Sequence, residues 1–392
     1  MKPFLKALRS KGVVMVKKLL SLLPVQDTIL FESSPDFACN TYPVFLLLRK
    51  ALPEYKMVWA VTEKKAVPNG VDDTFLIESN RVFPKLKTFY YMCTAKAVVF
   101  SNRVIDKCRP GQVHIFLGHG SKTKKTRGVY EPGANVDYIN VQSHFFDDIV
   151  TYEYNCEKEK LVYLGYPRCD SFFVVCPEEV KRKLHLDGNS RYFVWLPTFR
   201  KHRNHDAMSG MHSGLYSQLG MPLVYDMESL ASLEKFLDAH NMVIYFKPHP
   251  AQDVSGLVRA QTRNIRIIKD TDLADMDVSL YDLLAASDGL ITDYSSVFFD
   301  YLLADKPIAT TTDDMEEWKK MTGFAFDLDA FLDEATTRIS NLHGLYEFLE
   351  GIDRETDRKA AGRKRIRELT NIYYDGDSAK RVAAFIREKI GV

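Results

Sequence analysis

The chain has 392 residues, of which 46% are hydrophobic, and this is enough material for two cores of ordinary domain size. Its 53 basic and 52 acidic residues leave a formal net charge of +1, so the sequence offers no overall positive field for collecting nucleic acid, and we expect no nucleic-acid partner. Six cysteines are scattered without the paired spacing of a zinc site or the density of a disulfide scaffold, which favours a reducing, cytoplasmic environment.

Membrane contact, if any, is expected at the amino terminus. No apolar run approaches the roughly 18 residues of a spanning helix and no cleavable signal pattern is found, so we expect a chain that does not cross a membrane. Residues 1–25 nevertheless interleave six Lys and Arg residues with Leu, Val and Phe, as a basic amphipathic helix on an anionic membrane surface would. A helix packed on its own domain or on a neighbouring subunit would carry the same stripe, and both interpretations stay open.

Short apolar runs rich in β-branched and aromatic residues alternate with stretches of helical length. Such alternation predicts α/β units, in which helices connect the strands of a parallel sheet. In the first half, the predicted strands are residues 28–31, 57–61, 97–100, 113–117, 138–141 and 161–164, and the predicted helices are 42–50 and 82–95. In the second half, the predicted strands are 192–196, 243–246, 265–268, 290–292 and 308–310, and the predicted helices are 228–239, 280–287 and 296–303.

The alternation pauses in a charged segment, residues 177–190, which indicates a domain boundary. We therefore predict an amphipathic segment at 1–25, one domain at 26–176 and a second at 190–392, whose last helix could return to the first domain. Residues 201–222, rich in His, Gly, Ser and Met, are typical of a long loop. Because doubly wound sheets bind ligands at the carboxyl ends of their strands, we expect the active site in a cleft between the two domains.

The first candidate site follows the strand at 113–117. This strand leads into Gly118, His119 and Gly120, and Lys122 begins a run of basic residues. Glycines let a backbone approach a ligand closely, and an imidazole can accept the proton of a hydroxyl nucleophile near neutral pH. His119 is therefore the candidate general base, although a turn histidine beside solvated lysines would give the same pattern.

Cationic side chains also follow two further strands. The strand at 243–246 leads to Lys247 and His249, each followed by a proline that restricts the backbone. A cation beside an imidazole suits a diphosphate on which charge develops, but prolines also punctuate ordinary loops. The strand at 192–196 leads to Thr198 and Arg200, and the planar guanidinium of Arg200 suits phosphate, although most arginines simply lie at the surface.

A third group of polar residues follows the strand at 290–292. Asp293 ends it, and Ser295 and Ser296 then begin an apolar helix, whose free N–H groups and hydroxyls would suit a phosphate. An N-cap without a ligand is the simpler alternative. Arg168, near the domain boundary, could contact a ligand or form an interdomain ion pair. The sequence contains no Gly-x-Gly-x-x-Gly fingerprint, no Gly-Lys-Ser phosphate loop and no nucleophile elbow, so nicotinamide enzymes, P-loop ATPases and α/β-hydrolases are not supported.

Six segments in this order resemble the CDP-glycerol glycerophosphotransferase family, the primases and polymerases of wall teichoic acid and related capsule enzymes. They are GHGSKTKK, LGYPRCD, LPTFR, FKPHP, SLYDLLAASDGLITDYSSVFFDY and YDGDSAKRV. The early segment FESSPDFACNTYPVFLLL is similar to the family's first strand, loop and helix, with Asn40 in the matching place. The resemblance implies a GT-B fold, which consists of two Rossmann-like domains facing a central cleft. It also implies an amino-terminal acceptor domain, a carboxyl-terminal domain for the CDP-linked donor, and peripheral attachment to the inner face of the cell membrane.

The resemblance also implies roles for single residues. His119 matches the histidine of the family's His-Gly motif and His249 that of its Lys-x-His-Pro motif, both regarded there as essential. Ser295 and Ser296 match the serine pair on the donor side, and Arg200 matches the arginine of Pro-Thr-x-Arg. Lys122, Arg168 and Asn40 are candidates for contact with the acceptor or for a hinge. The sequence departs from the family on the acceptor side. Gly118 stands where the family usually has Trp, and Ser-Lys-Thr at 121–123 replaces its usual continuation, which puts the acceptor's identity in question.

These observations together predict a phosphotransferase. An acceptor hydroxyl would attack the β-phosphorus of CDP-glycerol or a similar CDP-polyol, and CMP would leave. Fixed cations and N–H dipoles would neutralise the diphosphate, so we expect no obligatory metal. A glycosyltransferase using a nucleotide sugar and a non-catalytic membrane scaffold in polymer assembly remain as alternatives. The choice of glycerol or ribitol, the lipid-linked or polysaccharide acceptor, single addition or polymerisation, and the oligomeric state stay open.

Overall fold

The computed structural model describes residues 15–392, except 62–66, 69, 72–74, 79–85, 106, 129, 199–218, 249–253, 313–314, 322 and 353–356. The chain divides into two compact units. Unit 1 comprises Met1–His119, Thr126–Asp170 and Asp375–Val392, and unit 2 comprises Gly120–Lys125 and Ser171–Tyr374. After the short segment Gly120–Lys125, the chain passes into unit 2 at Ser171, earlier than the predicted domain end at 176, and the charged segment at 177–190 begins with helix α6 (Pro177–Lys183) of that unit.

Unit 1 contains a seven-stranded sheet in the order β3-β2-β1-β4-β5-β6-β7, in which neighbouring strands run parallel. Its strands are β1 (Gln26–Glu32), β2 (Lys56–Val61), β3 (Phe75–Glu78), β4 (Ala95–Phe100), β5 (Val113–Phe116), β6 (Tyr138–Asn140) and β7 (Leu161–Val162). Strand β1 is central, with Leu30 opposite Val58 of β2 and Val98 of β4. Helices cover both faces of such a sheet, which explains why the central strands are continuous apolar runs.

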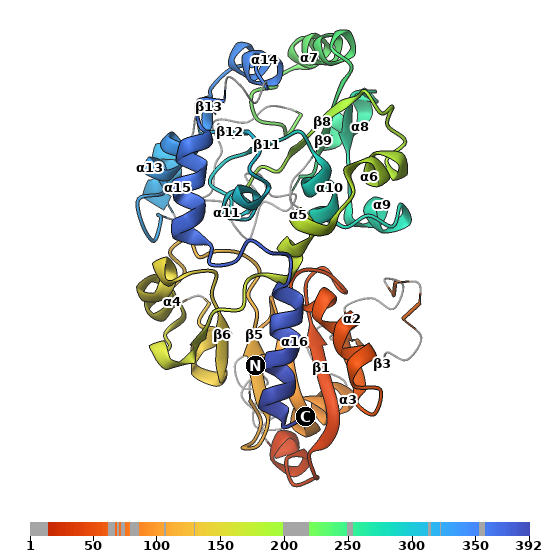
Figure 1. Cartoon of the computed structure of the whole chain (residues 1–392), viewed down its shortest axis with the longest axis vertical. Coiled ribbons are helices and arrows are strands. Elements are labelled where there is room, and N and C mark those ends of the chain that lie inside the picture. Colours follow the sequence, from red (N-terminus) through yellow and green to blue (C-terminus); the bar gives the residue numbers. More distant parts are fainter. Residues whose placement is uncertain are drawn as a thin grey trace, which may run out of the picture. The chain divides into compact units, whose positions relative to one another are not determined.

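The helices of unit 1 include the last helix of the chain (Figure 1). They are α2 (Thr41–Ala51), α3 (Leu86–Thr94), α4 (Asp147–Tyr154) and α16 (Ser378–Ile390), together with the short 3₁₀ turns η2 (Pro132–Asn135), η3 (His144–Phe146), η4 (Lys158–Lys160) and η5 (Pro167–Asp170). Val382 and Ile386 of α16 lie in the same buried cluster as Phe31 and Trp59 of the sheet. Asp170 accepts the N–H groups of Ser378 and Ala379, at 2.9 and 2.8 Å, and so fixes the start of α16.

Unit 2 repeats the architecture with a six-stranded parallel sheet in the order β10-β9-β8-β11-β12-β13. Its strands are β8 (Arg191–Trp195), β9 (Met242–Phe246), β10 (Ile265–Ile267), β11 (Gly289–Thr292), β12 (Ile308–Thr311) and β13 (Thr337–Ile339). Its other helices are α5 (Ser171–Val174), α7 (Met227–Ala239), α8 (Ser255–Ala260), α9 (Asp270–Asp275), α10 (Leu280–Ala286), α11 (Val297–Tyr301), η6 (Leu302–Ala304), α12 (Met315–Met321), α13 (Leu328–Ala335), α14 (Leu342–Glu350) and α15 (Ala360–Thr370).

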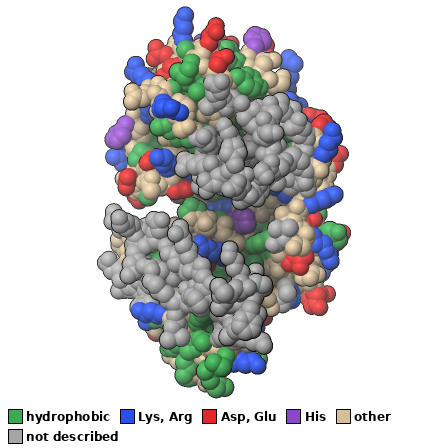
Figure 2. Space-filling model, turned by 180° about the vertical axis from the view of Figure 1, so that it is seen from behind, with side chains coloured by type: hydrophobic (Ala, Val, Ile, Leu, Met, Phe, Trp, Pro, Cys, Tyr) green, Lys and Arg blue, Asp and Glu red, His purple; other side chains and the backbone are tan. Residues whose placement is uncertain are grey.

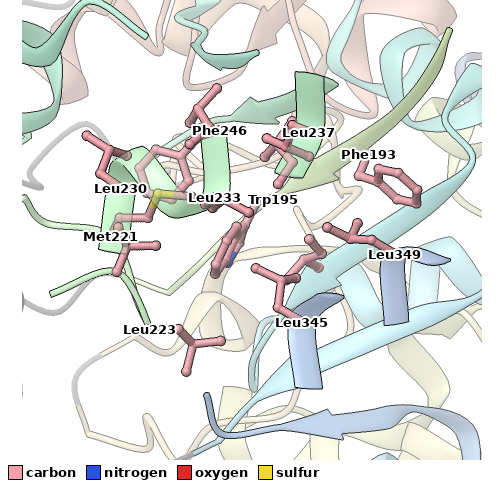
Figure 3. Packing of buried hydrophobic residues seen from close by; sticks show 14 of the residues in the cluster. Phe193, Trp195, Met221, Leu223, Leu230, Leu233, Leu237, Phe246, Leu345 and Leu349 are labelled. Atoms are coloured by element: carbon pink, nitrogen blue, oxygen red, sulfur yellow. The ribbon is translucent and has the colours of Figure 1, made fainter. Parts of the chain in front are cut away.

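The core of unit 2 packs one face of this sheet against α7 and α14 (Figure 3). Trp195 and Phe246, from adjacent strands, meet edge to face with ring centroids 6.0 Å apart. Leu233 of α7 and Leu345 of α14 are fully buried in the same cluster. The core thus fixes the directions in which β8 and β9 end, and these strand ends carry candidate site residues.

The predicted α/β class is confirmed: each unit is built on a doubly wound parallel sheet. Each predicted strand is present, although β7 ends at Val162 rather than continuing to residue 164. Strands β3 and β13 were missed: β13 (TRI) contains a single apolar residue, and the short run of β3 (FLIE) was not recognised as a strand. The predicted helix at 296–303 is α11 followed by the 3₁₀ turn η6. Most of the predicted loop at 201–222 lies outside the described residues.

Candidate active site

His119 follows β5 in unit 1, in a turn whose backbone only glycine adopts readily. The Leu117 N–H donates to the Phe100 carbonyl at 2.8 Å, and Gly118 then takes a φ of +68°. This left-handed residue sends the side chain of His119 outward, where it is exposed. Its Nδ1 lies 3.0 Å from the carbonyl oxygen of Ser101. Because a carbonyl can only accept, Nδ1 carries the proton, and the lone pair of the neutral ring is on Nε2.

Two other predicted residues, Asn40 and Arg168, fix the backbone of this turn. Asn40 has no exposed surface, and its Nδ2 donates to the carbonyls of Leu117 at 3.2 Å and Gly118 at 2.9 Å. Arg168 donates from Nη1 to the His119 carbonyl at 2.7 Å. The Oδ1 of Asn40 in turn accepts the Arg168 N–H at 3.3 Å. Both were predicted as acceptor or hinge residues, and both contact the backbone that carries the candidate base.

In unit 2, polar residues follow three neighbouring strands, β9, β8 and β11. Asp293, fully buried after β11, accepts the N–H and the hydroxyl of Thr198, both at 2.6 Å. Thr198 belongs to the loop that leaves β8, so this carboxylate joins two strand ends. Lys247 follows β9, and its Nζ lies 3.1 Å from a carboxylate oxygen of Asp270. The carboxyl edge of the sheet therefore carries a lysine after β9 and a buried carboxylate after β11, on the two sides of β8.

Ser295 and Ser296 lie where they were predicted, at the start of α11. Both are half-buried, and Ser296 is the N-cap, although its side chain makes no capping hydrogen bond. The backbone N–H groups of Phe298 and Phe299 already donate to the carbonyls of Ser295 and Ser296. The helix has five residues before η6 begins, so its dipole is small. The hydroxyls are thus the stronger candidates for contact with a phosphate.

Lys122, predicted as an acceptor or hinge residue, belongs to unit 2. The Ala325 N–H donates to the Thr123 carbonyl at 2.8 Å, which attaches residues 120–125 to the segment after α12. The ammonium of Lys124 lies 4.9 Å above the Trp318 ring, and Trp318 stacks on Tyr294 at 4.4 Å. The basic run after His119 is therefore anchored on aromatic residues, and one of these directly follows Asp293 in the sequence.

The remaining two predicted residues, His249 and Arg200, lie outside the described residues. The expectation that His249 and Arg200 bind the diphosphate on which His119 acts therefore stays a prediction. Within the described part of the chain, no group of three or more His, Cys, Asp or Glu side chains could bind a metal ion. The same part contains no helix long and apolar enough to span a bilayer.

Sequence reasoning missed Glu32 and Tyr130, which lie beside His119. Glu32 ends β1 with 1% of its surface exposed, and its Oε2 accepts the N–H groups of Asn102 at 3.1 Å and Arg103 at 3.0 Å. Burial raises the pKa of Glu32, although these hydrogen bonds and the charge of Arg103 act in the opposite direction. The Tyr130 hydroxyl donates to the Asn102 carbonyl at 2.7 Å, and its ring lies 6.4 Å from that of His119. The signal for Glu32 was present: a polar residue directly after an apolar strand.

Comparison with known proteins agrees with this architecture. The chain is 25% identical over 346 residues to a teichoic acid poly(glycerol phosphate) polymerase of Bacillus subtilis, in an alignment that covers 79% of this chain and 42% of that protein. It is 30% identical over 268 residues to a teichoic acid ribitol-phosphate primase of Bacillus spizizenii, covering 64% of this chain and 59% of the primase. The chain thus spans about half the length of these relatives.

Among solved structures, the wall teichoic acid polymerase TagF superposes with a TM-score of 0.73 at 20% identity, over 99% of this chain and 97% of that one. This likeness establishes a shared fold. The sequence pattern of the family described as CDP-Glycerol:Poly(glycerophosphate) glycerophosphotransferase matches residues 15–388, nearly the whole chain. The chain therefore belongs to the CDP-glycerol:poly(glycerophosphate) glycerophosphotransferase family.

Proposed function

We propose that this protein transfers glycerol phosphate, or a related polyol phosphate, from a CDP-linked donor to a hydroxyl of a cell-envelope polymer or lipid-linked acceptor. The observation that carries the proposal is the exposed His119 ring, whose Nδ1 lies against the Ser101 carbonyl in a chain of this family. An imidazole fixed in this tautomer offers its Nε2 lone pair to a substrate proton.

The proposed reaction is a single displacement at phosphorus. Nε2 of His119 accepts the proton of the acceptor hydroxyl, and the oxygen forms a bond to the β-phosphorus of the donor. The bond from that phosphorus to the bridging oxygen breaks, and CMP leaves with the bonding electrons. Lys247, with Arg200 and His249 from the sequence motifs, would neutralise the charge on the leaving phosphate, since phosphoryl transfer depends mainly on positioning and electrostatics.

On the donor side, the proposal rests on Thr198, Asp293, Ser295 and Ser296. The Thr198 backbone is bonded to the buried carboxylate of Asp293, which would keep the loop after β8 in one conformation for the diphosphate. The two serine hydroxyls would donate to phosphate oxygens. None of these steps uses a metal ion, so we expect activity to persist in a chelator, and loss of activity in EDTA with recovery in magnesium would contradict this detail.

We further propose that the protein attaches peripherally to the inner face of the cell membrane through its first described residues. Met15, Leu19 and Leu22 expose 62%, 60% and 80% of their surface beside Lys17 and Lys18. Figure 2 shows hydrophobic side chains gathered in its lowest part, which corresponds to the start of the described chain in Figure 1. Apolar side chains flanked by lysines suit an anionic bilayer surface. Binding to phosphatidylglycerol vesicles but not to phosphatidylcholine vesicles is expected, and equal binding to both would contradict the electrostatic part.

The experiment that tests the function combines purified protein with CDP-glycerol or CDP-ribitol, labelled on the β-phosphate, and a panel of lipid-linked acceptors. We expect stoichiometric CMP release and label in the acceptor product, with product size separating single addition from polymerisation. His119→Ala should lower the rate by about 10²- to 10⁴-fold. Transfer of a sugar from a nucleotide sugar would instead establish a glycosyltransferase, and unchanged polymer formation in cells carrying His119→Ala would indicate a scaffold.

A further inference from the structure

We propose that Glu32 is a positioning residue for the reaction, which acts on His119 through the peptide group between Ser101 and Asn102. The inference rests on the proposed function, in which His119 is the general base. It assigns to the buried carboxylate two effects on the imidazole: it fixes the tautomer and orientation of the ring, and it increases the basicity of Nε2.

The contacts form one continuous chain. The carbonyl oxygen of Ser101 lies 3.0 Å from His119 Nδ1, and the N–H of the same peptide group, that of Asn102, donates to Glu32 Oε2 at 3.1 Å. The two ends of a trans peptide point in opposite directions, so one planar unit connects the imidazole to the carboxylate. Glu32 is therefore linked to His119 as a carboxylate is to the histidine of a catalytic triad, with a peptide group inserted between them.

The turn that carries this peptide is fixed from several sides. The same Oε2 also accepts the Arg103 N–H at 3.0 Å, and the Ser101 N–H donates to the Glu32 carbonyl at 3.1 Å. The Asn102 side chain accepts the Ser34 N–H at 3.0 Å, so the turn is bound to the residues that follow β1. With Glu32 as the central acceptor, the Ser101 carbonyl has one direction in which to point. This is the physical reason that Nδ1, rather than Nε2, carries the proton.

The negative charge adds a second effect. A peptide N–H that donates to an anion makes its own carbonyl a stronger acceptor, because hydrogen bonds in a chain polarise one another. A stronger acceptor at Nδ1–H places more electron density on the imidazole, and the opposite nitrogen becomes more basic. In the described contacts, the charged and titratable groups that face this series of bonds include Arg103, whose Nε lies 3.8 Å from Glu32 Oε1, and Tyr130, whose hydroxyl is bonded to Asn102. Neither lies between the carboxylate and the peptide group.

The chain provides a matched control in unit 2. Glu234 of α7 accepts two consecutive backbone N–H groups on one oxygen, those of Arg263 at 2.8 Å and Asn264 at 2.7 Å. The geometry resembles that of Glu32, but Glu234 contacts no candidate site residue in the described contacts. A loss of activity that came only from the general destabilisation caused by removing such a carboxylate would therefore appear in both variants.

The experiment compares Glu32→Ala and Glu32→Gln with Glu234→Ala in the full chain. We expect Glu32→Ala to lower kcat by about 10- to 100-fold, with the KM for CDP-glycerol within about 2-fold of wild type, because the donor residues lie elsewhere. Glu32→Gln retains a carbonyl oxygen for the two N–H groups but lacks the charge, so it should recover part of the rate. Glu234→Ala should retain the wild-type kcat.

A spectroscopic readout separates this proposal from the assignment of His119 as the base. The long-range proton–nitrogen correlation spectrum, with His119→Asn to identify the peaks, reports which ring nitrogen carries the proton. We expect Nδ1–H in wild type and a mixture of tautomers in Glu32→Ala.

An unchanged tautomer in Glu32→Ala, or a kcat of Glu32→Ala equal to that of Glu234→Ala, would overturn the proposal. If the double variant Glu32→Ala/His119→Ala were slower than His119→Ala alone, Glu32 would act by another route, and this result would also overturn the proposal. If His119→Ala kept full activity, the proposed base would fail, while the spectrum would still decide whether Glu32 controls the ring.

Discussion

Asp293 provides the sharpest test of how unit 2 fixes its candidate donor site. The carboxylate has no exposed surface, and Thr198 donates to it twice, from N–H and from the hydroxyl, at 2.6 Å each. The substitution Asp293→Ala removes both acceptors. The loop after β8 then retains a backbone N–H and a hydroxyl that have lost their carboxylate partner.

The expected magnitude follows from these two bonds. A hydrogen bond to a charged group contributes about 1.5–3 kcal/mol, and part of this is recovered because alanine no longer buries a charge. We therefore expect Asp293→Ala to lower the free energy of unfolding of unit 2 by about 3 kcal/mol, or about 6–12 °C in Tm for a domain of this size. Thr198→Val removes the hydroxyl alone and should cost about 1–2 kcal/mol. Asp293→Asn can keep both contacts, with its amide oxygen toward the N–H, and should cost about 1 kcal/mol.

The assay is urea unfolding followed by intrinsic fluorescence, combined with a measurement of CDP-glycerol affinity by calorimetry. The order of stability should be wild type, Asp293→Asn, Thr198→Val and then Asp293→Ala, and donor affinity should fall in the same order. If the free energy of unfolding of Asp293→Ala lay within about 1 kcal/mol of the wild-type value, or if this variant bound CDP-glycerol as tightly as wild type, the idea that the carboxylate fixes the start of the loop after β8 would be refuted.

Three further predictions concern the rest of the fold. Asn40→Leu keeps the branched shape of the side chain but removes the contacts of Asn40 with three backbone groups, and should lower the free energy of unfolding by about 3 kcal/mol in urea and lower the transfer rate. Ile386→Ala, in the buried face of α16, should cost about 2–5 kcal/mol of unit 1 stability by the same measurement. Burial raises the pKa of Asp357, but its pairing with Arg363 outweighs this and keeps the pKa below its ordinary value. The pair therefore contributes stability that is present above about pH 4 and is lost as the pH falls, and Arg363→Met should flatten that part of a Tm–pH profile.

The fold was predictable because its signal is repeated along the chain. Strands β1, β4 and β9 each contain a continuous apolar run (ILF, AVVF and MVIYF), as strands covered on both faces do, and each run is followed by turn and helix signals. The assignment of residues 120–125 to unit 2 could not be predicted in this way. It depends on the Thr123 carbonyl and the Trp318 ring, which are distant in sequence from the strand that precedes the segment.

The candidate site was predictable only in part. The rule that chemistry follows strand ends identified His119, Lys247 and Asp293, because carboxyl ends of parallel strands meet at one edge of a sheet. The same rule applied equally to Glu32, yet it could not place Glu32 above the other polar residues at strand ends. Nothing in a strand followed by Glu-Ser-Ser indicates that the carboxylate is buried. The role of Asn40 was likewise hidden, because its partners lie some 77 and 128 residues away in sequence.

Both units thus use the same physical device at their candidate sites. Each has a carboxylate buried at a strand end that accepts two donors from a neighbouring loop: Glu32 with Asn102 and Arg103, and Asp293 with Thr198. A buried carboxylate is a costly way to fix a loop, because desolvation opposes its charge. Catalysis can offset this cost, because a dipole or a ring that already points in the right direction needs no reorganisation when the transition state forms. On this argument, replacing either carboxylate should reduce activity more than the accompanying loss of stability explains, whereas replacing Glu234 should reduce stability alone.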